Sequence, residues 1–279
     1  MSLARIDFDQ YPIVIMSCDS YSDIWQPLLE SFDKFWPDCP FPIYLCSELK
    51  EFDHPRIRNL RTERELGWAA MTIEILRRLQ TPNVIYLQED YILKGQVSND
   101  KVVRYLEFFQ NRNAAYLRLV PLPNPDQLVD AELNVGIIYA GSHYRTSLQA
   151  AIWDRQVLLD LLRPEESGWD FERESIRRSE DIDRDFLSVA VNSDHPNINH
   201  HKYPIDYYST AILQGKWQKE GVKILRRAGL DIDTKDRGVL TRWDFFYYHQ
   251  RKKGDGIRLR VLTWLDRVLF NRRKNKRLY

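Results

Sequence analysis

The chain of 279 residues carries 41 Lys and Arg against 40 Asp and Glu, a formal net charge of +1. Its 43% of hydrophobic and 29% of charged residues are typical of a folded soluble protein, which excludes disordered, collagen-like and disulfide-scaffold classes. The charge is unevenly distributed, because residues 251–279 hold eleven Lys and Arg but only two Asp, a net +9 that leaves −8 on residues 1–250. Such an acidic body argues against nucleic-acid binding, whereas the basic end predicts contact with an anionic membrane surface.

The cysteines and the apolar runs predict a cellular location. Cys18, Cys39 and Cys46 are an odd number without metal-site spacing, which favours a reducing compartment. The first apolar run follows Asp7 and Asp9 and is too short for the core of a signal peptide. No run approaches the roughly 20 apolar residues of a membrane-spanning helix. We therefore expect a cytoplasmic protein, or one that is peripheral on the inner face of the membrane.

The first ninety residues alternate between short apolar runs and amphipathic stretches. The pattern predicts strands at 12–17, 42–46, 57–60 and 83–87, and helices at 23–36 and 68–79. Strands alternating with helices predict an α/β fold with helices on both faces of the sheet. Ligands of such sheets bind beyond the carboxyl ends of the strands.

The rest of the chain continues this pattern less regularly. It predicts helices at 102–109, 154–162, 218–227 and from 242 onward, strands at 115–120 and 186–191, and extended chain at 203–208. The stretches 135–140 and 144–152 predict a strand pair, and 165–185 predicts a polar insert. Two regions follow, a domain at 1–240 and a basic amphipathic helix at 241–279.

Two adjacent carboxylates, Glu89 and Asp90, directly follow the predicted strand at 83–87. Neighbouring carboxylates repel each other and are costly to bury without a cation or hydrogen-bond donors. A divalent metal ion is a natural partner, because hard cations with oxygen ligands neutralise charge on a diphosphate. The alternative is an ordinary polar strand end that caps the next turn.

Three parts of the sequence carry a family resemblance: IVIMSCDSYSDIWQPLLESF (13–32), GWAAMTIEILRRL with NVIYLQEDYIL (67–93), and YRTSLQAAIWDRQVLLDLLRPEESGWDFE (144–172). They resemble a group of bacterial GT-A-fold glycosyltransferases that build surface polysaccharides, over about residues 12–217. The resemblance implies a Rossmann-like mixed sheet flanked by helices. It also implies an inverting, hexosyltransferase-type enzyme with a nucleotide-sugar donor and a glycan or lipid-linked saccharide acceptor.

The same resemblance implies a donor site. GT-A enzymes hold Mn²⁺ or Mg²⁺ with a DxD-type motif, and here Gln88 replaces the first Asp, so that Asp90 is the first expected metal ligand and Glu89 the second. Because of Gln88, a metal-independent reaction is the alternative. Lys216 is expected to reach a diphosphate oxygen as a point charge.

The loop after the first strand is expected to receive the nucleotide base and ribose, through Ser17, Cys18, Asp19 and Tyr21. An Asp accepts from a base N–H or a ribose hydroxyl, and a Tyr ring can stack on a base. The alternative for Asp19 is a turn or helix-cap role. Trp68 is expected to line the donor pocket, or else to be a buried residue at a helix start.

Inverting sugar transfer needs a general base close to the acceptor hydroxyl. The resemblance places this base at a helix start in the second half of the fold, where Asp170 and Glu172 lie beside Trp169. Asp170 is favoured by position and Glu172 is the close alternative. Helix capping explains carboxylates at this position equally simply. The run Glu180–Asp183 predicts a solvated helix end, with a smaller expectation that it supplies the base.

Two further regions are singled out by composition. His195, His200 and His201 match no closed zinc site and predict a polar loop near the acceptor. In residues 257–279, apolar side chains recur at helical spacing among Arg and Lys. This pattern predicts a helix that lies in an anionic membrane interface or docks on the body of the protein.

Two other functions compete with sugar transfer. A sugar-1-phosphate nucleotidyltransferase shares the sheet architecture, but it has a Gly-rich loop with Arg and Lys after the first strand, where this chain has CDSYSD. A non-catalytic glycan-binding protein with the same fold is the second alternative. Neither a GxxxxGK[ST] nor a GxGxxG motif occurs in the sequence.

Overall fold

A computed structural model describes residues 6–191, 203–213 and 215–241. The chain divides into two units, one of residues 1–211 and 223–232 and the other of residues 212–222 and 233–279. The predicted division into 1–240 and 241–279 stays a prediction, because the basic segment at 242–279 lies outside the described residues.

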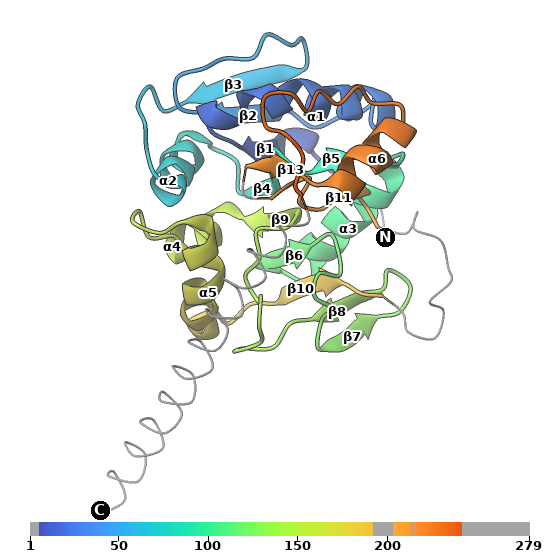
Figure 1. The fold of residues 1–279 in the computed structure, drawn as a ribbon. Coiled ribbons are helices and arrows are strands. Elements are labelled where there is room, and N and C mark those ends of the chain that lie inside the picture. Colours follow the sequence, from blue (N-terminus) through green and yellow to red (C-terminus); the bar gives the residue numbers. More distant parts are fainter. Residues whose placement is uncertain (1–5, 192–202, 214, 242–279) are drawn as a thin grey trace, which may run out of the picture. The chain divides into compact units, whose positions relative to one another are not determined.

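The first unit contains a mixed sheet, and in the described part of the chain its strand order is β3-β2-β1-β4-β9-β6-β10-β8-β7 (Figure 1). The strands are β1 (Ile13–Met16), β2 (Ile43–Ser47), β3 (Ile57–Arg61), β4 (Asn83–Gln88), β6 (Tyr116–Arg118), β7 (Gln127–Asp130), β8 (Val135–Ile137), β9 (Ala151–Asp154) and β10 (Phe186–Val189). Strand β9 is antiparallel to both β4 and β6, so that β1 to β4, β6 and β10 all run in one direction. This confirms the predicted α/β class with a mixed sheet.

The helices of the first unit are α1 (Ser22–Phe35), α2 (Trp68–Arg78), α3 (Asn99–Asn111), α4 (Arg155–Leu161) and α5 (Gly168–Arg178), with 3-10 turns η1 (Phe8–Gln10), η2 (Asp19–Tyr21) and η3 (Ser179–Asp181). A two-stranded ladder joins β5 (Ile92–Leu93) to β11 (Tyr207–Tyr208). In the second unit, β12 (Ile212–Leu213) pairs with β13 (Lys216–Trp217). Helix α6 (Lys219–Arg227) contains residues of both units.

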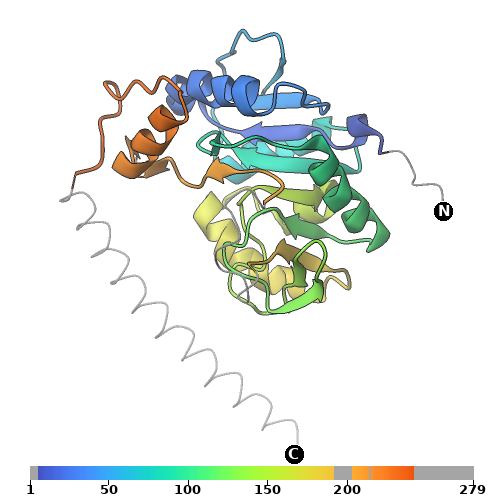
Figure 2. The same cartoon turned by 90° about the vertical axis from the view of Figure 1, so that its right-hand side faces the viewer.

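Helices cover both faces of the large sheet. The chain runs from β1 outward to β2 and β3 and then returns past β1 to β4, so right-handed connections place α1 and α2 on opposite faces. Helices α2, α4 and α5 pack in one cluster with Val14, Tyr86 and Trp153 of the sheet. On the other face α1 meets α3, where Trp36 Nε1 donates to Asn99 Oδ1 over 2.6 Å. Figure 2 views the sheet from the side of α3.

Most predicted elements are present, but the predicted strand pair at 135–140 and 144–152 is wrong. Strand β8 ends at Ile137, and β9 spans only Ala151–Asp154 and pairs with β4 and β6 instead. Residues 144–150 are irregular, because their backbone groups bond to side chains such as Arg118, whose Nη1 donates to the Tyr144 carbonyl. The predicted polar insert at 165–185 contains α5, which begins after Ser167. Among the described residues no helix has the length and apolarity needed to cross a membrane.

Candidate active site

The loops after β1, β2 and β4 meet at one edge of the sheet, which we call the carboxyl edge. The register places Met16 of β1 beside both Cys46 of β2 and Gln88 of β4. Burial raises the pKa of the Cys18 thiol, and the carboxylates of Glu89 and Glu48 raise it further. The structure therefore brings the predicted nucleotide loop and the predicted metal-binding pair together.

Asp19 holds the β1 and β2 loops together. Its carboxylate accepts hydrogen bonds from the backbone N–H groups of Glu48, Leu49 and Lys50 at 3.1–3.2 Å. In return, the Asp19 N–H donates to Glu48 Oε2 over 2.5 Å. Lys50 Nζ also donates to the Asp19 carbonyl and to Ser22 Oγ. These contacts give Asp19 a turn-stabilising role, which is the alternative stated for it above.

Glu48 is a site residue that sequence reasoning missed. It is only 9% exposed, and burial raises the pKa of its carboxyl group, as does the nearby Asp19 carboxylate. The available signal is its position two residues after the predicted strand at 42–46. A carboxylate at the carboxyl edge beside Asp19 is placed to accept from ribose or base donors.

The remaining residues of the β1 loop are held by contacts with α1 and with each other. Ser17 is buried, and its Oγ accepts a 2.7 Å hydrogen bond from Trp25 Nε1 of α1. Cys18 Sγ lies 3.0 Å from Ser20 Oγ. Tyr21 is half-buried at the end of η2, where α1 begins. The loop is therefore ordered by its own contacts with the protein.

Tyr86 of β4 connects the acidic strand end to α5. Burial raises the pKa of its hydroxyl, and the charges of Glu89 and Glu172 add to the shift. Both carboxylates therefore lie within electrostatic reach of one hydroxyl group. Trp68 Nε1 donates to this hydroxyl over 3.3 Å, and the Trp68 ring packs against Phe171, with 5.5 Å between ring centroids. Trp68 thus lies where β4 and α5 approach each other.

Glu172 is on the side of α5 that faces the sheet. Its Oε1 accepts from Ser147 Oγ at 3.1 Å and from the Leu148 N–H at 2.8 Å. These two residues precede β9 at the carboxyl edge, and buried tyrosines hold their carbonyl groups. Tyr116 donates to the Ser147 carbonyl at 3.1 Å and Tyr91 to the Leu148 carbonyl at 2.9 Å. Glu172 is therefore an oriented carboxylate at the same edge as Glu89.

Asp170 has different surroundings, although it lies only two residues away on α5. It forms a capping box with Ser167, in which the Asp170 N–H donates to Ser167 Oγ and the Ser167 N–H donates to Asp170 Oδ2. The Ser167 hydroxyl and N–H, followed by Arg173, lower the pKa of Asp170. Its side chain is 42% exposed. These are the contacts of a helix cap. Glu172, in contrast, contacts residues outside its own helix.

Asp90 is buried, and its charge is among the causes that raise the pKa values of Tyr91 and Tyr207, after burial. Within the described ranges no group of three or more His, Cys, Asp or Glu side chains is arranged to hold a metal ion. Adjacent carboxylates nevertheless suit a divalent ion such as Mg²⁺, which typically keeps water and substrate phosphate oxygens as its other ligands. That Glu89 and Asp90 hold such an ion stays a prediction.

For four predicted residues the structure gives no position relative to the carboxyl edge. Lys216 lies in β13 of the second unit, which is described separately from the first. His195, His200 and His201 lie outside the described residues. The carboxyl edge as described consists of first-unit residues alone.

Comparison with known proteins gave structural similarities only. No protein-family model and no curated protein matches the chain. Among solved structures, the chain is similar to TarS residues 1–349 of S. aureus, with 12% identity, 81% of this chain and 68% of that chain covered, and a TM-score of 0.46. It is also similar to the galactosyltransferase LgtC in complex with donor and acceptor sugar analogues, with 11% identity, coverage of 81% and 98%, and a TM-score of 0.43.

A third similar structure is a putative glucose-1-phosphate thymidylyltransferase from Bacillus anthracis, with 10% identity, coverage of 81% and 98%, and a TM-score of 0.42. By name, the last two of these structures are a galactosyltransferase and a putative nucleotidyltransferase.

Proposed function

We propose that the chain is a glycosyltransferase that moves a sugar from a nucleotide-diphosphate donor to a saccharide acceptor. One observation supports this most directly. Glu89 follows β4, and Glu172 of α5 is bound to Ser147 and Leu148 just before β9, the strand that pairs with β4, so two carboxylates with different surroundings lie at the same edge. Sugar transfer needs one acidic group for the donor diphosphate, through a cation, and another for the acceptor hydroxyl.

On the donor side, the nucleotide binds the loop after β1. Asp19 fixes this loop to the β2 loop, so the loop needs little further ordering when the nucleotide binds. Glu48 and Tyr21 are the groups that we expect to contact ribose and base. Glu89 and Asp90 would hold Mn²⁺ or Mg²⁺. When bound, the ion neutralises charge that develops on the leaving diphosphate.

On the acceptor side, Glu172 is the general base. Hydrogen bonds from Ser147 and Leu148 fix the orientation of its carboxyl group, so that it can accept the proton of an acceptor hydroxyl as that oxygen attacks the anomeric carbon. A single displacement of this kind inverts the anomeric configuration. Asp170 is instead assigned to capping α5.

Trp169 supplies an acceptor contact. It is 59% exposed at the start of α5, three residues before Glu172. An exposed indole ring offers an apolar face on which a sugar ring can pack. We extend the proposal to a bacterial surface polysaccharide as the product, and to delivery of the enzyme to the inner membrane face by residues 251–279.

The nucleotidyltransferase alternative is disfavoured by the charge of the β1 loop. That activity needs positive groups for a nucleoside triphosphate, and residues 17–22 contain none. Lys50 lies beside the loop, but its Nζ is bound to the Asp19 carbonyl and to Ser22 Oγ. Burial, and after it the charges of Glu89 and Glu48, raise the pKa of Cys18 within this loop.

The proposal is tested by thermal unfolding with UDP, GDP and the corresponding triphosphates, each with and without Mn²⁺. A ligand that binds the native state raises the melting temperature by mass action. We expect stabilisation by one diphosphate, increased by Mn²⁺, and slow hydrolysis of the matching nucleotide sugar. Stabilisation by triphosphates alone would favour the nucleotidyltransferase, and diphosphate binding without donor hydrolysis would favour a non-catalytic protein.

A further inference from the structure

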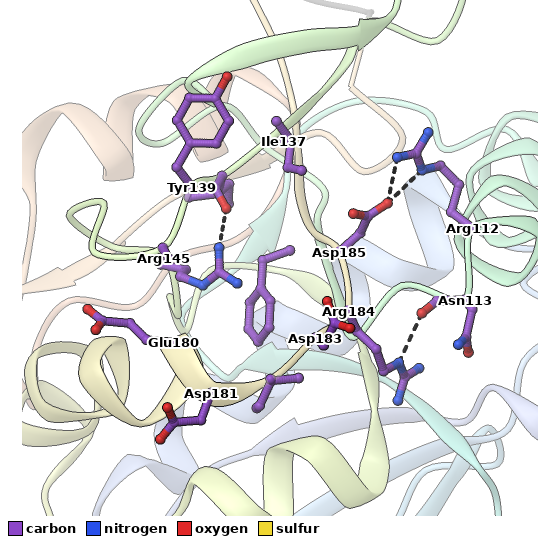
Figure 3. Close-up of a pocket in the computed structure, with 14 residues that line it drawn as sticks. Arg112, Asn113, Ile137, Tyr139, Arg145, Glu180, Asp181, Asp183, Arg184 and Asp185 are labelled. Atoms are coloured by element: carbon purple, nitrogen blue, oxygen red, sulfur yellow. Dashed lines mark hydrogen bonds and ion pairs between the residues drawn. The ribbon is translucent and has the colours of Figure 1, made fainter.

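A cavity lies at the opposite edge of the sheet, where β6 and β10 begin and β8 ends. Its volume is about 480 Å³. We call it the amino-edge pocket, and Figure 3 shows the side chains that line it. Those that matter most here are Tyr139, Arg145, Glu180, Asp181 and Asp183. None of them belongs to the carboxyl edge.

Two of the three arginines in the amino-edge pocket are neutralised by neighbouring carboxylates. Arg112 Nη2 lies 2.6 Å from Asp185 Oδ2. Arg184 Nη1 lies 2.7 Å from Asp154 Oδ2, and the same guanidinium donates to two carbonyl groups. These arginines are therefore committed to the protein, and they offer little attraction to an anionic ligand.

The third arginine, Arg145, forms part of the pocket floor. It is only 6% exposed, and its guanidinium carbon lies 4.1 Å from the centroid of the Phe186 ring. Nε donates to Ser179 Oγ over 3.1 Å, and Nη1 donates to the Ile138 carbonyl. Nη2 has no acceptor among the described residues. It is not a fully buried atom, so a ligand in the pocket can reach it. A ligand oxygen would satisfy this donor.

Three carboxylates line the mouth of the pocket. Glu180, Asp181 and Asp183 are exposed, and none of them has a hydrogen-bond or ion-pair partner within the part of the chain that the structure describes. Ionised carboxylates only accept hydrogen bonds. The mouth therefore selects ligand groups that donate, whereas Arg145 at the floor selects a group that accepts.

These opposite demands identify a ligand class. An anion would satisfy Arg145 but would be repelled by the carboxylates, and a polyamine would have the reverse difficulty. Neutral hydroxyl groups satisfy both, because each can donate and accept. Tyr139, which also lines the pocket and is 48% exposed, adds an aromatic face against which a sugar ring can pack. The volume lies within the usual range of small-molecule sites.

We propose that the amino-edge pocket binds one or two residues of a neutral saccharide, independently of the carboxyl edge. Arg145 bonds a ring or hydroxyl oxygen at the floor. The carboxylates of Glu180, Asp181 and Asp183 accept from hydroxyl groups at the mouth. The chain then has two saccharide sites, and this one contributes binding without chemistry.

The test uses the full chain labelled with ¹⁵N and titrated with maltotriose and cellotriose as neutral probes. Spermidine and inorganic phosphate serve as the cationic and anionic comparisons. We expect one trisaccharide to shift the amide resonances of Tyr139, Gly141 and Asp183. Glu180→Ala and Asp183→Ala should each weaken this binding roughly tenfold, because each removes a hydrogen bond to a charged group. Glu174→Ala, an exposed carboxylate of α5 outside the pocket, is the matched control.

Either of two results would overturn the proposal. In one, neither trisaccharide shifts the pocket resonances at millimolar concentration. In the other, only spermidine or phosphate does so, which would make the pocket an ion site. Titration with a nucleoside diphosphate, monitored at Cys18 and Leu49, reports separately on the carboxyl edge. Failure of the saccharide site is thereby distinguished from failure of the proposed transferase.

Discussion

Asp19 and Glu48 bind each other reciprocally across the carboxyl edge. The Asp19 N–H donates to Glu48 Oε2 over 2.5 Å, and the Glu48 N–H donates to Asp19 Oδ1 over 3.2 Å. Each carboxylate thus accepts a hydrogen bond from the backbone of the other residue. The two loops that we assign to nucleotide binding therefore behave as one structural element.

The first prediction concerns Asp19→Ala. This variant leaves three backbone N–H groups without their acceptor, so we expect the free energy of unfolding to fall by about 1–3 kcal/mol and nucleoside diphosphate binding to weaken. Urea unfolding and nucleotide titration measure the two effects. Glu51→Ala removes an exposed carboxylate paired with Arg61 and should cost less than about 1 kcal/mol. Equal stability of the two variants would contradict the role given to Asp19.

The second prediction concerns Glu172→Gln. The amide keeps an oxygen for Ser147 and Leu148 but cannot take a proton at neutral pH, so turnover should fall by roughly 10² to 10⁴. Nucleotide affinity and melting temperature should change little. Steady-state kinetics with a saccharide acceptor provide the measurement. If Glu172→Gln retained full turnover while Asp170→Asn lost it, the assignment of the base would have to be reversed.

The third prediction concerns the capping box. Ser167→Ala and Asp170→Ala should each lower the free energy of unfolding by about 1 kcal/mol, without loss of turnover per folded molecule. Hydrogen bonds from Ser167 depress the folded-state pKa of Asp170, so its contribution is present above the unfolded value and is lost as pH falls through the folded one. The difference between wild type and Asp170→Ala should therefore shrink in strong acid. If the difference in free energy of unfolding stayed constant as the pH was lowered, the ionised Asp170 would not be stabilising the helix through the capping box.

The fourth prediction uses Cys18 to report on Glu89. The Glu89 carboxylate is among the causes that raise the pKa of the Cys18 thiol, so Glu89→Gln should lower this pKa and speed alkylation by iodoacetamide. Mn²⁺ bound at Glu89 should act in the same direction. Cys46 is buried, and burial raises the pKa of Cys39 to about 12, so both should react more slowly. Mass spectrometry follows the site. Glu65→Gln is the control. Equal alkylation rates of Cys18 in the two variants would contradict an influence of the Glu89 charge on Cys18.

The fifth prediction concerns the basic segment. Residues 251–279 carry a net charge of +9, and basic residues near an anionic surface contribute on the order of 1 kcal/mol each. The chain should therefore sediment with phosphatidylserine vesicles, less so as salt rises, and this binding should vanish when residues 250–279 are removed. A truncated chain that melts much earlier, with no vesicle binding by the intact chain, would show that the segment docks on the protein.

Sequence patterns predicted those parts of the fold that depend on local order. The run at 13–16 is apolar throughout because both faces of β1 are covered, and such a run is visible without a structure. The partners of Asp19 were not predictable, since they are backbone N–H groups 29 to 31 residues away. Neither was the choice between Asp170 and Glu172, which depends on which side of α5 faces the sheet.

Other elements were missed for identifiable reasons. Strand β7 lies at the sheet edge with Leu128 and Val129 exposed, so its sequence lacks the burial pattern of a strand. The stretch at 144–152 is apolar enough to resemble a strand, but several of its backbone groups bond to side chains from elsewhere in the chain. Only its end joins the sheet as β9.

The residues just before β9 should also be recognisable by amide hydrogen exchange. The Leu148 N–H is bonded to Glu172, and the Ala150 N–H is bonded to the hydroxyl of Tyr207 on β11. Solvent can reach these protons only when α5 or β11 releases its side chain, so they should exchange as slowly as amides in a strand. Replacing Tyr207 by Phe should speed exchange at Ala150 alone. The irregular segment before β9 would then be protected from amide exchange as strongly as a β-strand, although side chains and not a neighbouring strand accept its hydrogen bonds.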